Sequence, residues 1–310
     1  MWEESQLFPE LRRLAKLEVL DLRGDLRLAA VGGDAEATLR AIERFHTDDA
    51  PDLVFFYARP TLLSDDVFEI IRQKWKCPIL GMNLDDRVEY HDGIKRQDYR
   101  GYGRWAKKFD INITSSKLAE AWYRADGAAV RFMPQGFARH ASYSQPPTSS
   151  VYKYSLSFVG ALKPERADLV KKLEEYGVHV SVFGRGWDKG GWVDDPVGLY
   201  RTSQINLGVG AILAAGNITS LKGRDIECPA TGACYLTSYN WELPELFEIG
   251  REILCYRNVE ELIEMQCYYA ARPEECLAIA RAAHKRAHSE HTWERRLRDL
   301  FNELGFHSSP

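Results

Sequence analysis

The chain has 310 residues, of which 45% are hydrophobic and 28% are charged, and its formal net charge at pH 7 is −4. The length suits two domains rather than one, and the composition is that of a globular protein rather than a disordered or fibrous one. The charge balance gives no support to a nucleic-acid-binding role, and no apolar run of about 18 residues predicts a membrane span.

The start of the chain and its cysteines indicate where the protein resides. The opening "MWEESQLFPELRRL" is acidic and amphipathic, and it lacks the cationic and then apolar pattern of a signal peptide. The six cysteines, at positions 77, 228, 234, 255, 267 and 276, contain no C-x-x-C pair. We therefore expect a cytoplasmic protein with reduced, buried thiols and no metal site.

The first half of the chain alternates helical and strand-like patterns. Amphipathic helices are expected at residues 6–16, 35–46, 65–75 and 117–127. Strands are expected at residues 52–58, 77–83, 110–115 and 130–136. The alternation predicts a parallel sheet with helices on both faces. Such a domain usually opens with a strand, whereas this chain opens with a helix, and the sequence leaves open whether a first strand is missing.

The second half repeats this organisation after a linker. Residues 139–155 are rich in Ser, Pro and Tyr and show no periodicity, which is typical of a linker. Strands are then expected at residues 156–162, 178–184 and 205–211. Helices are expected at 164–177, 198–204 and 222–231, with a long helical tail at 273–304. The fold class is therefore α/β, with two similar halves.

The stretch "SLKGRDIECPATG" (220–232) raises an electrostatic question. A helix is expected from Lys222 to Thr231, capped by Thr219 or Ser220, and it would place Lys222 and Arg224 at its electropositive start. Cations are unfavourable at the positive end of a helix dipole, and a bound phosphate or pyrophosphate would offset that repulsion. Glu227, three residues after Arg224, could then accept hydrogen bonds from the vicinal hydroxyls of a ribose. The alternative is a surface ion pair between Arg224 and Glu227.

The stretch "KGRDIECPATGACYLTSYNWELPELFEIGREILCYRNVEELIE" (222–264) also carries a family resemblance. It is similar to the C-terminal domain of the spore-maturation (CgeB-like) glycosyltransferases, which are related to glycosyl transferase families 1 and 4 with the GT-B fold. Thr231 stands where that group has Cys, and Ala233 where it has a second Gly. The similarity covers roughly residues 110–305 and is strongest over 220–265.

The resemblance implies two Rossmann-like domains facing a central cleft, with a C-terminal helix packing back on the first domain. The acceptor-side domain would occupy residues 1–140, the nucleotide-sugar domain 151–285, and the C-terminal helix and tail 286–310. The activity implied is transfer of a sugar, expected to be a hexose, from a UDP- or GDP-sugar with retention. Neither a permanently bound cofactor nor a metal is implied. The acceptor is left open between a glycan, a protein, a small molecule and modified DNA, and the oligomeric state is open too.

Site residues follow from the resemblance by position. Glu227 matches the glutamate that holds the donor ribose, and Lys222 and Arg224 match basic residues beside the diphosphate. The remaining binding candidates are Gly160, Lys163, Arg166, Gly184, Arg185, Thr219, Ser220, Leu221 and Gly223. Thr219 stands where family 4 enzymes carry a second glutamate, so the donor sugar is expected to contact backbone N–H groups of residues 217–221 instead.

The glycine-rich stretch "GRGWDKGG" (184–191) imitates a dinucleotide-binding fingerprint. No helix is expected after it, and the fingerprint needs a helix start to hold its phosphates. A Rossmann oxidoreductase is therefore excluded. Within a GT-B fold, this loop would lie near the donor base.

The catalytic candidates on the acceptor side are Asp85 and Asp86, which follow the strand at 77–83. A carboxylate there could orient or deprotonate an acceptor hydroxyl, while Lys222 and Arg224 stabilise the leaving diphosphate. A helix cap or a surface ion pair is the alternative for the two aspartates. Two other functions stay open for the chain, a non-catalytic sugar-nucleotide-binding subunit and a GT-B sugar-nucleotide epimerase.

Overall fold

The computed structural model describes residues 2–22, 34–57, 59–91, 101–140, 143–148, 151–187, 193, 196–210 and 219–306. The chain forms two compact units. Unit 2 is Lys16–Pro134, and unit 1 joins Met1–Ala15 to Gln135–Pro310. The opening helix therefore groups with the second half of the chain. The functional domain boundaries proposed from the sequence stay a prediction.

Unit 2 is built on a parallel sheet with the strand order β1-β2-β3-β4. Its strands are β1 (Val54–Tyr57), β2 (Ile79–Asn83), β3 (Ile111–Thr114) and β4 (Val130–Phe132). Its helices are α3 (Asp34–Arg44), α4 (Asp65–Trp75), α5 (Asp86–Glu89) and α6 (Lys117–Ala125), with 3₁₀ turns η3 (Pro60–Leu62) and η4 (Tyr102–Lys108). Among the described residues, no strand precedes Val54.

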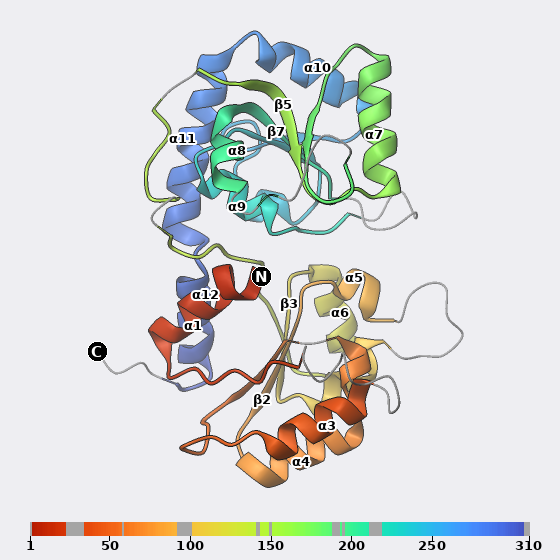
Figure 1. The fold of residues 1–310 in the computed structure, drawn as a ribbon, viewed down its shortest axis with the longest axis vertical. Helices are drawn as coiled ribbons and strands as arrows, with labels where there is room; N and C mark the ends of the chain where they lie inside the picture. Colours follow the sequence, from red (N-terminus) through yellow and green to blue (C-terminus); the bar gives the residue numbers. More distant parts are fainter. Residues whose placement is uncertain are drawn as a thin grey trace. The chain divides into compact units, whose positions relative to one another are not determined.

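Unit 1 contains a second parallel sheet, with the order β6-β5-β7-β8-β9. Its strands are β5 (Tyr154–Val159), β6 (Ser181–Phe183), β7 (Ser203–Gly208), β8 (Tyr235–Ser238) and β9 (Leu254–Tyr256). Its helical segments are the π-helix η1 (Glu3–Leu7), α1 (Phe8–Leu14), α7 (Pro164–Glu175), α8 (Pro196–Thr202), α9 (Arg224–Ala230), η6 (Leu243–Glu245), α10 (Val259–Ala270), α11 (Pro273–Glu290) and α12 (Trp293–Glu303). Figure 1 shows α10 running between α7 and α11, both of which it contacts. The predicted α/β class with parallel sheets is confirmed.

Short-range chemistry explains where several helices start. Ser64, Ser116, Asn258 and Thr292 each accept a hydrogen bond from a backbone N–H of the first turn of α4, α6, α10 and α12, respectively. This side-chain capping satisfies donors that a helix start otherwise leaves unpaired. The cap at Thr292 also divides the single tail helix expected from the sequence into α11 and α12.

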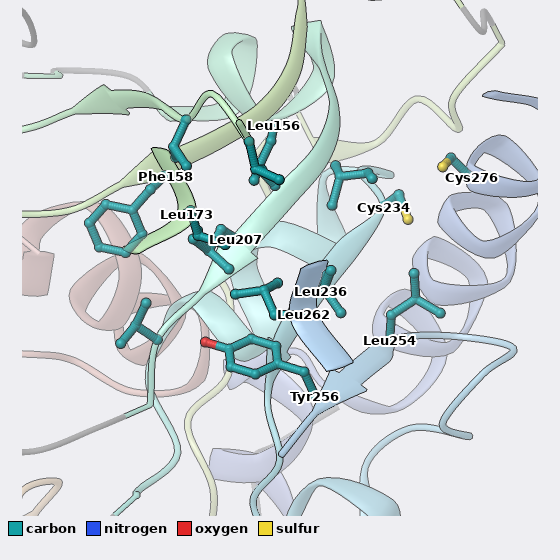
Figure 2. Close-up of a cluster of buried hydrophobic side chains, with 14 of the residues drawn as sticks. Leu156, Phe158, Leu173, Leu207, Cys234, Leu236, Leu254, Tyr256, Leu262 and Cys276 are labelled. Atoms are coloured by element: carbon teal, nitrogen blue, oxygen red, sulfur yellow. The ribbon is translucent and has the colours of Figure 1, made fainter. Parts of the chain in front are cut away.

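Each unit has its own hydrophobic core. In unit 1, apolar residues of β5, β7 and β8 pack against α7, α10 and α11, and Figure 2 shows Leu156, Leu207 and Leu236 in this cluster. In unit 2, aromatic rings dominate the core, among them Phe68, Tyr102 and Phe109. Parallel strands covered on both faces read as continuous apolar runs, which is why the sequence located them well.

The cysteines are free thiols, and four of the six are buried, whereas Cys267 is exposed. In the part of the chain that the structure describes, no helix is both long and apolar enough to cross a membrane.

Candidate functional site

The strand order of unit 1 indicates where its sheet would bind a ligand. The chain passes from β5 to β6 on one side and then returns to β7 on the other side of β5. The strand order thus reverses between β5 and β7. In open α/β sheets, ligands bind outside the carboxyl ends of the strands at such a switch point.

The guanidinium of Arg224 lies at this switch point. Its Nη1 donates to the carbonyl oxygen of Val159 at 2.9 Å, and its Nη2 to that of Val209 at 3.4 Å. Val159 ends β5, and Val209 directly follows β7. A Cβ atom on Gly160 would lie 2.5 Å from Nη1 of Arg224, so glycine at this position leaves the room that the guanidinium needs.

A second arginine shares the same aromatic support. Arg166, in the first turn of α7, is buried and donates from Nη1 to the carbonyl oxygen of Ala161 at 2.7 Å. The guanidinium carbons of Arg166 and Arg224 lie 5.4 and 5.0 Å from the centre of the Phe158 ring. Burial, and then the neighbouring charge of Arg224, lower the pKa of Arg166 to about 10, so it stays charged at neutral pH.

The two arginines leave hydrogen-bonding capacity unused. Among the described residues, neither forms an ion pair, and Nε of each is buried without a hydrogen-bond partner. The hydroxyl of Ser220, in the segment that precedes α9, is likewise buried and unpartnered. Unpaired buried donors are costly, and an anion with several oxygen acceptors would satisfy them.

The helix that follows this segment differs from the one that the sequence predicts. Helix α9 begins at Arg224 instead of Lys222 and ends at Ala230. Neither Thr219 nor Ser220 caps it, because Gly223 occupies the N-cap position and no side chain caps it there. A helix of seven residues contributes little dipole, so the arginine charges, and not an electropositive helix tip, make this region favourable for an anion.

Asp225, which the sequence analysis did not single out, organises the start of α9. Its Oδ2 accepts the backbone N–H of Lys222 at 2.7 Å, and its Oδ1 accepts the hydroxyl of Tyr235 at 2.7 Å. Burial raises the pKa of Asp225, whereas these hydrogen bonds act to lower it. An aspartate near a helix start is a known N-terminal signal, but its burial and its partner on β8 depend on tertiary structure.

Glu227 lies one turn further along α9 and is half-buried. Its Oε1 accepts a hydrogen bond from the indole Nε1 of Trp2 at 3.0 Å. Burial raises the pKa of Glu227, and the Trp2 hydrogen bond and the charge of Arg224 oppose that rise. Within the described part of the chain, Glu227 forms no ion pair with Arg224, so the surface-pair alternative does not hold. The structure thus brings Arg224, Arg166, Ser220 and Glu227 into one region of unit 1.

The loops after β5 and β6 are joined at this region. The carbonyl oxygen of Gly160 accepts the indole N–H of Trp187 at 2.9 Å, and the backbone N–H of Leu162 donates to the carbonyl oxygen of Arg185 at 2.9 Å. Gly184 has φ +129°, and a Cβ there would lie 2.4 Å from the Gly160 oxygen. Glycine is therefore required at position 184 by both its backbone conformation and this close approach.

The other predicted binding residues vary in exposure. Lys163 and Arg185 are exposed, Thr219, Lys222 and Gly223 are half-buried, and Leu221 is buried. The backbone N–H of Ser220 donates to the carbonyl oxygen of Gly210 at 3.0 Å, which holds this segment beside the end of β7. Of the backbone groups expected to contact the donor sugar, those of residues 217 and 218 lie outside the described residues.

The two catalytic candidates belong to unit 2. Asp85 is exposed at the start of α5, and its side chain does not cap the helix. Asp86 is only 2% exposed, and its Oδ1 accepts the hydroxyl of Tyr123 at 2.9 Å. Burial raises the pKa of Asp86 to about 8. Asp86 is therefore closed to direct contact with an acceptor, whereas Asp85 is open to solvent.

A family model described as "Glycosyl transferase-like" matches residues 166–302, which include Arg166, Ser220, Arg224 and Glu227. No curated protein sequence matches the chain.

Several solved structures are similar in fold. TarM from S. aureus aligns with a TM-score of 0.63 and 9% identity over 86% of this chain. This chain covers 57% of TarM, so it spans a little over half of TarM's length. HepE from Anabaena, solved with UDP-glucose, aligns with a TM-score of 0.60 and 13% identity over 87% of this chain and 81% of HepE. The pneumococcal O-GlcNAc transferase GtfA, solved with UDP and GlcNAc, aligns with a TM-score of 0.58 and 13% identity over 87% of this chain and 59% of GtfA. These likenesses show that the chain has the GT-B fold.

Proposed function

We propose that this chain is a glycosyltransferase that binds a nucleoside-diphosphate sugar through unit 1. The diphosphate would lie beside Arg224 and Arg166, and the ribose hydroxyls would bind Glu227. One observation carries the proposal. Two charged arginines meet on Phe158 at the switch point of the sheet without an ion pair among the described residues. A diphosphate provides the negative charge and the acceptors that this arrangement lacks.

The chemistry follows from the same charges. Glycosyl transfer breaks the bond between the anomeric carbon and the β-phosphate oxygen, and negative charge then develops on the leaving diphosphate. Arg224 is already fixed by the carbonyl oxygens of Val159 and Val209, so it can stabilise that charge without reorganising. Lys222 would add a third cation beside the diphosphate, after Arg224 and Arg166. Asp85 is the proposed partner of the acceptor hydroxyl.

The donor is proposed to be a UDP- or GDP-sugar carrying a hexose, transferred with retention. HepE was solved with UDP-glucose and GtfA with UDP and GlcNAc, which supports testing uridine nucleotides first. The family match over residues 166–302 supports sugar transfer in general. The narrower CgeB-like assignment rests on the motif at 222–264 and is part of this proposal.

Nucleotide binding tests the site directly. Titration calorimetry with UDP and GDP should show that Arg224→Ala and Glu227→Ala each weaken binding. The expected loss is about 1.5–3 kcal/mol, the usual contribution of hydrogen bonds to charged groups. Arg251→Ala removes the same charge from an exposed ion pair with Glu248 and should leave binding unchanged. Affinities that stay equal to wild type in both site variants would reject the assignment.

Product analysis separates transfer from its rivals. A thermal-shift screen with UDP-, GDP- and dTDP-sugars identifies the donor, because a ligand that binds the native state raises its melting temperature. With donor alone, a transferase yields at most slow release of free sugar, whereas an epimerase yields an isomeric sugar nucleotide. Donor binding without turnover on glycan, protein, small-molecule and DNA acceptors would indicate a binding subunit.

A further inference from the structure

The first residues of the chain are firmly attached to unit 1. Leu7 and Leu11 are buried, and α1 packs against α12. Oε1 of Gln6 accepts the backbone N–H of Ala138 at 3.0 Å, and Oε1 of Glu10 accepts that of Arg139 at 2.9 Å. Two side-chain acceptors thus join this segment to backbone that is more than 100 positions away in the sequence. Such anchoring is typical of a fixed part of the unit and not of a loose terminus.

This anchoring brings Trp2 to the proposed ribose carboxylate. The indole Nε1 donates to Oε1 of Glu227 at 3.0 Å. The ring of Trp2 meets that of Trp293 edge to face, with centroids 5.9 Å apart and an interplanar angle of 78°. Trp293 is fully buried at the start of α12, so the indole has a rigid support. An indole N–H can only donate, which suits it to a carboxylate acceptor.

The hydrogen bond from Trp2 gives the two carboxylate oxygens of Glu227 different roles. A carboxylate offers two oxygens and about four lone-pair sites. Trp2 binds Oε1, and the backbone of Gly223 is close to this oxygen too, because a Cβ built on Gly223 would lie 3.1 Å from it. Oε1 therefore already has a donor within the protein, and Oε2 is the oxygen that we assign to a ligand.

We propose that Trp2 is a positioning residue for nucleotide binding, which fixes the Glu227 carboxylate so that Oε2 meets the ribose hydroxyls. The inference rests on the proposed function, because it assigns a role within the same site. Trp2 itself need not touch the donor. Its hydrogen bond holds the Glu227 side chain in one orientation before the nucleotide arrives. Binding then costs less conformational entropy than it would with a freely rotating carboxylate.

The test removes the N–H and keeps an aromatic ring. Trp2→Phe, Glu227→Gln and the double variant are titrated with UDP and 2′-deoxy-UDP, and with GDP and 2′-deoxy-GDP. We expect wild type to prefer the ribonucleotide of whichever base binds more tightly. Trp2→Phe should weaken ribonucleotide binding about tenfold. It should also reduce the ratio of ribonucleotide affinity to deoxynucleotide affinity. In the Glu227→Gln background, the same substitution should have little further effect, because the group that Trp2 positions has lost its charge.

Controls separate positioning from folding and from obstruction. Trp241→Phe, at an exposed tryptophan, should leave both affinities unchanged. A general loss of structure would weaken ribo- and deoxynucleotide binding alike and lower the melting temperature, which would overturn the positioning role. Tighter binding in Trp2→Phe would mean that Trp2 competes with the nucleotide, and would overturn it too. Unchanged binding and preference in Trp2→Phe would reject the inference while the proposed function stands. Failure of wild type to bind UDP or GDP would reject both.

Discussion

At the residue scale, the site depends on what each charged group is paired with. Arg224 bonds to two strand-end carbonyl oxygens, and Asp225 bonds to the backbone of Lys222 and to Tyr235. Glu227 is bound by a tryptophan from the other end of the chain. Three charged residues within four positions therefore have three different environments. Their spacing in the sequence carries no information about those partners.

The sequence already singled out several residues of the proposed site. It placed Lys222, Arg224 and Glu227 together because two cations and a carboxylate follow a buried strand. It could not find the Trp2 contact, since that contact spans 225 positions and depends on how α1 packs. The role of Phe158 was equally hidden, because an apolar residue in a strand looks like ordinary core until two guanidinium groups are seen beside it.

A prediction at this scale concerns the pH dependence of stability. Burial raises the pKa of Asp86 to about 8, whereas an unfolded aspartate ionises near 4. Between roughly pH 4 and pH 8 the folded chain therefore holds a proton that the unfolded chain has lost, so stability falls as the pH rises through this window. Asp86→Asn keeps an acceptor for Tyr123 and removes the titration. Its melting temperature should fall less than that of wild type between pH 5 and pH 8.

Asp85→Asn, at the exposed neighbouring position, is the matched control and should follow the wild-type pH profile. If the melting temperatures of Asp86→Asn and wild type fall by the same amount between pH 5 and pH 8, then Asp86 is ionised in the folded protein and its assigned burial is wrong.

At the element scale, hydrophobic periodicity predicted most helices and strands. The differences arise at helix ends, where local signals compete. The tail divides at Thr292 because its side chain accepts the N–H of Arg295 and starts a new helix. Helix α9 is short because Pro229 lies in its last turn and Gly232, with φ +75°, follows its end. The hydrogen bonds of Asp225 to Lys222 and Tyr235 could not be predicted, since they depend on burial against β8.

Helix α4 offers a prediction about a helix end. Lys76 directly follows α4 and has φ 54°, a left-handed conformation that glycine adopts more readily than any L-residue. Its side chain is exposed. Lys76→Gly should therefore raise the free energy of unfolding by about 1 kcal/mol. Gln73→Gly, at an exposed position inside α4, should lower it by a similar amount. Chemical denaturation of both variants measures the contrast, and destabilisation by Lys76→Gly would contradict the assigned helix end.

At the scale of the whole molecule, the chain consists of two α/β units, each built on a parallel sheet. The residues of unit 1 are not contiguous in the sequence. Residues 1–15 belong with residues 135–310. This grouping was out of reach of sequence analysis, because η1 and α1 bind the backbone of Ala138 and Arg139, and α1 packs against α12. The α/β class with two similar halves, in contrast, was predictable from two runs of alternating strands and helices separated by a linker, and the GT-B fold was implied by the family resemblance of residues 222–264.

The central claim is that a nucleotide diphosphate binds unit 1 at the carboxyl ends of β5 and β7. A crystal structure of the chain with UDP or GDP tests it most directly. The account predicts that phosphate oxygens lie within hydrogen-bonding distance of Arg224 or Arg166 and that the ribose hydroxyls meet Glu227. A nucleotide bound elsewhere, or one whose diphosphate contacts neither arginine, would contradict it.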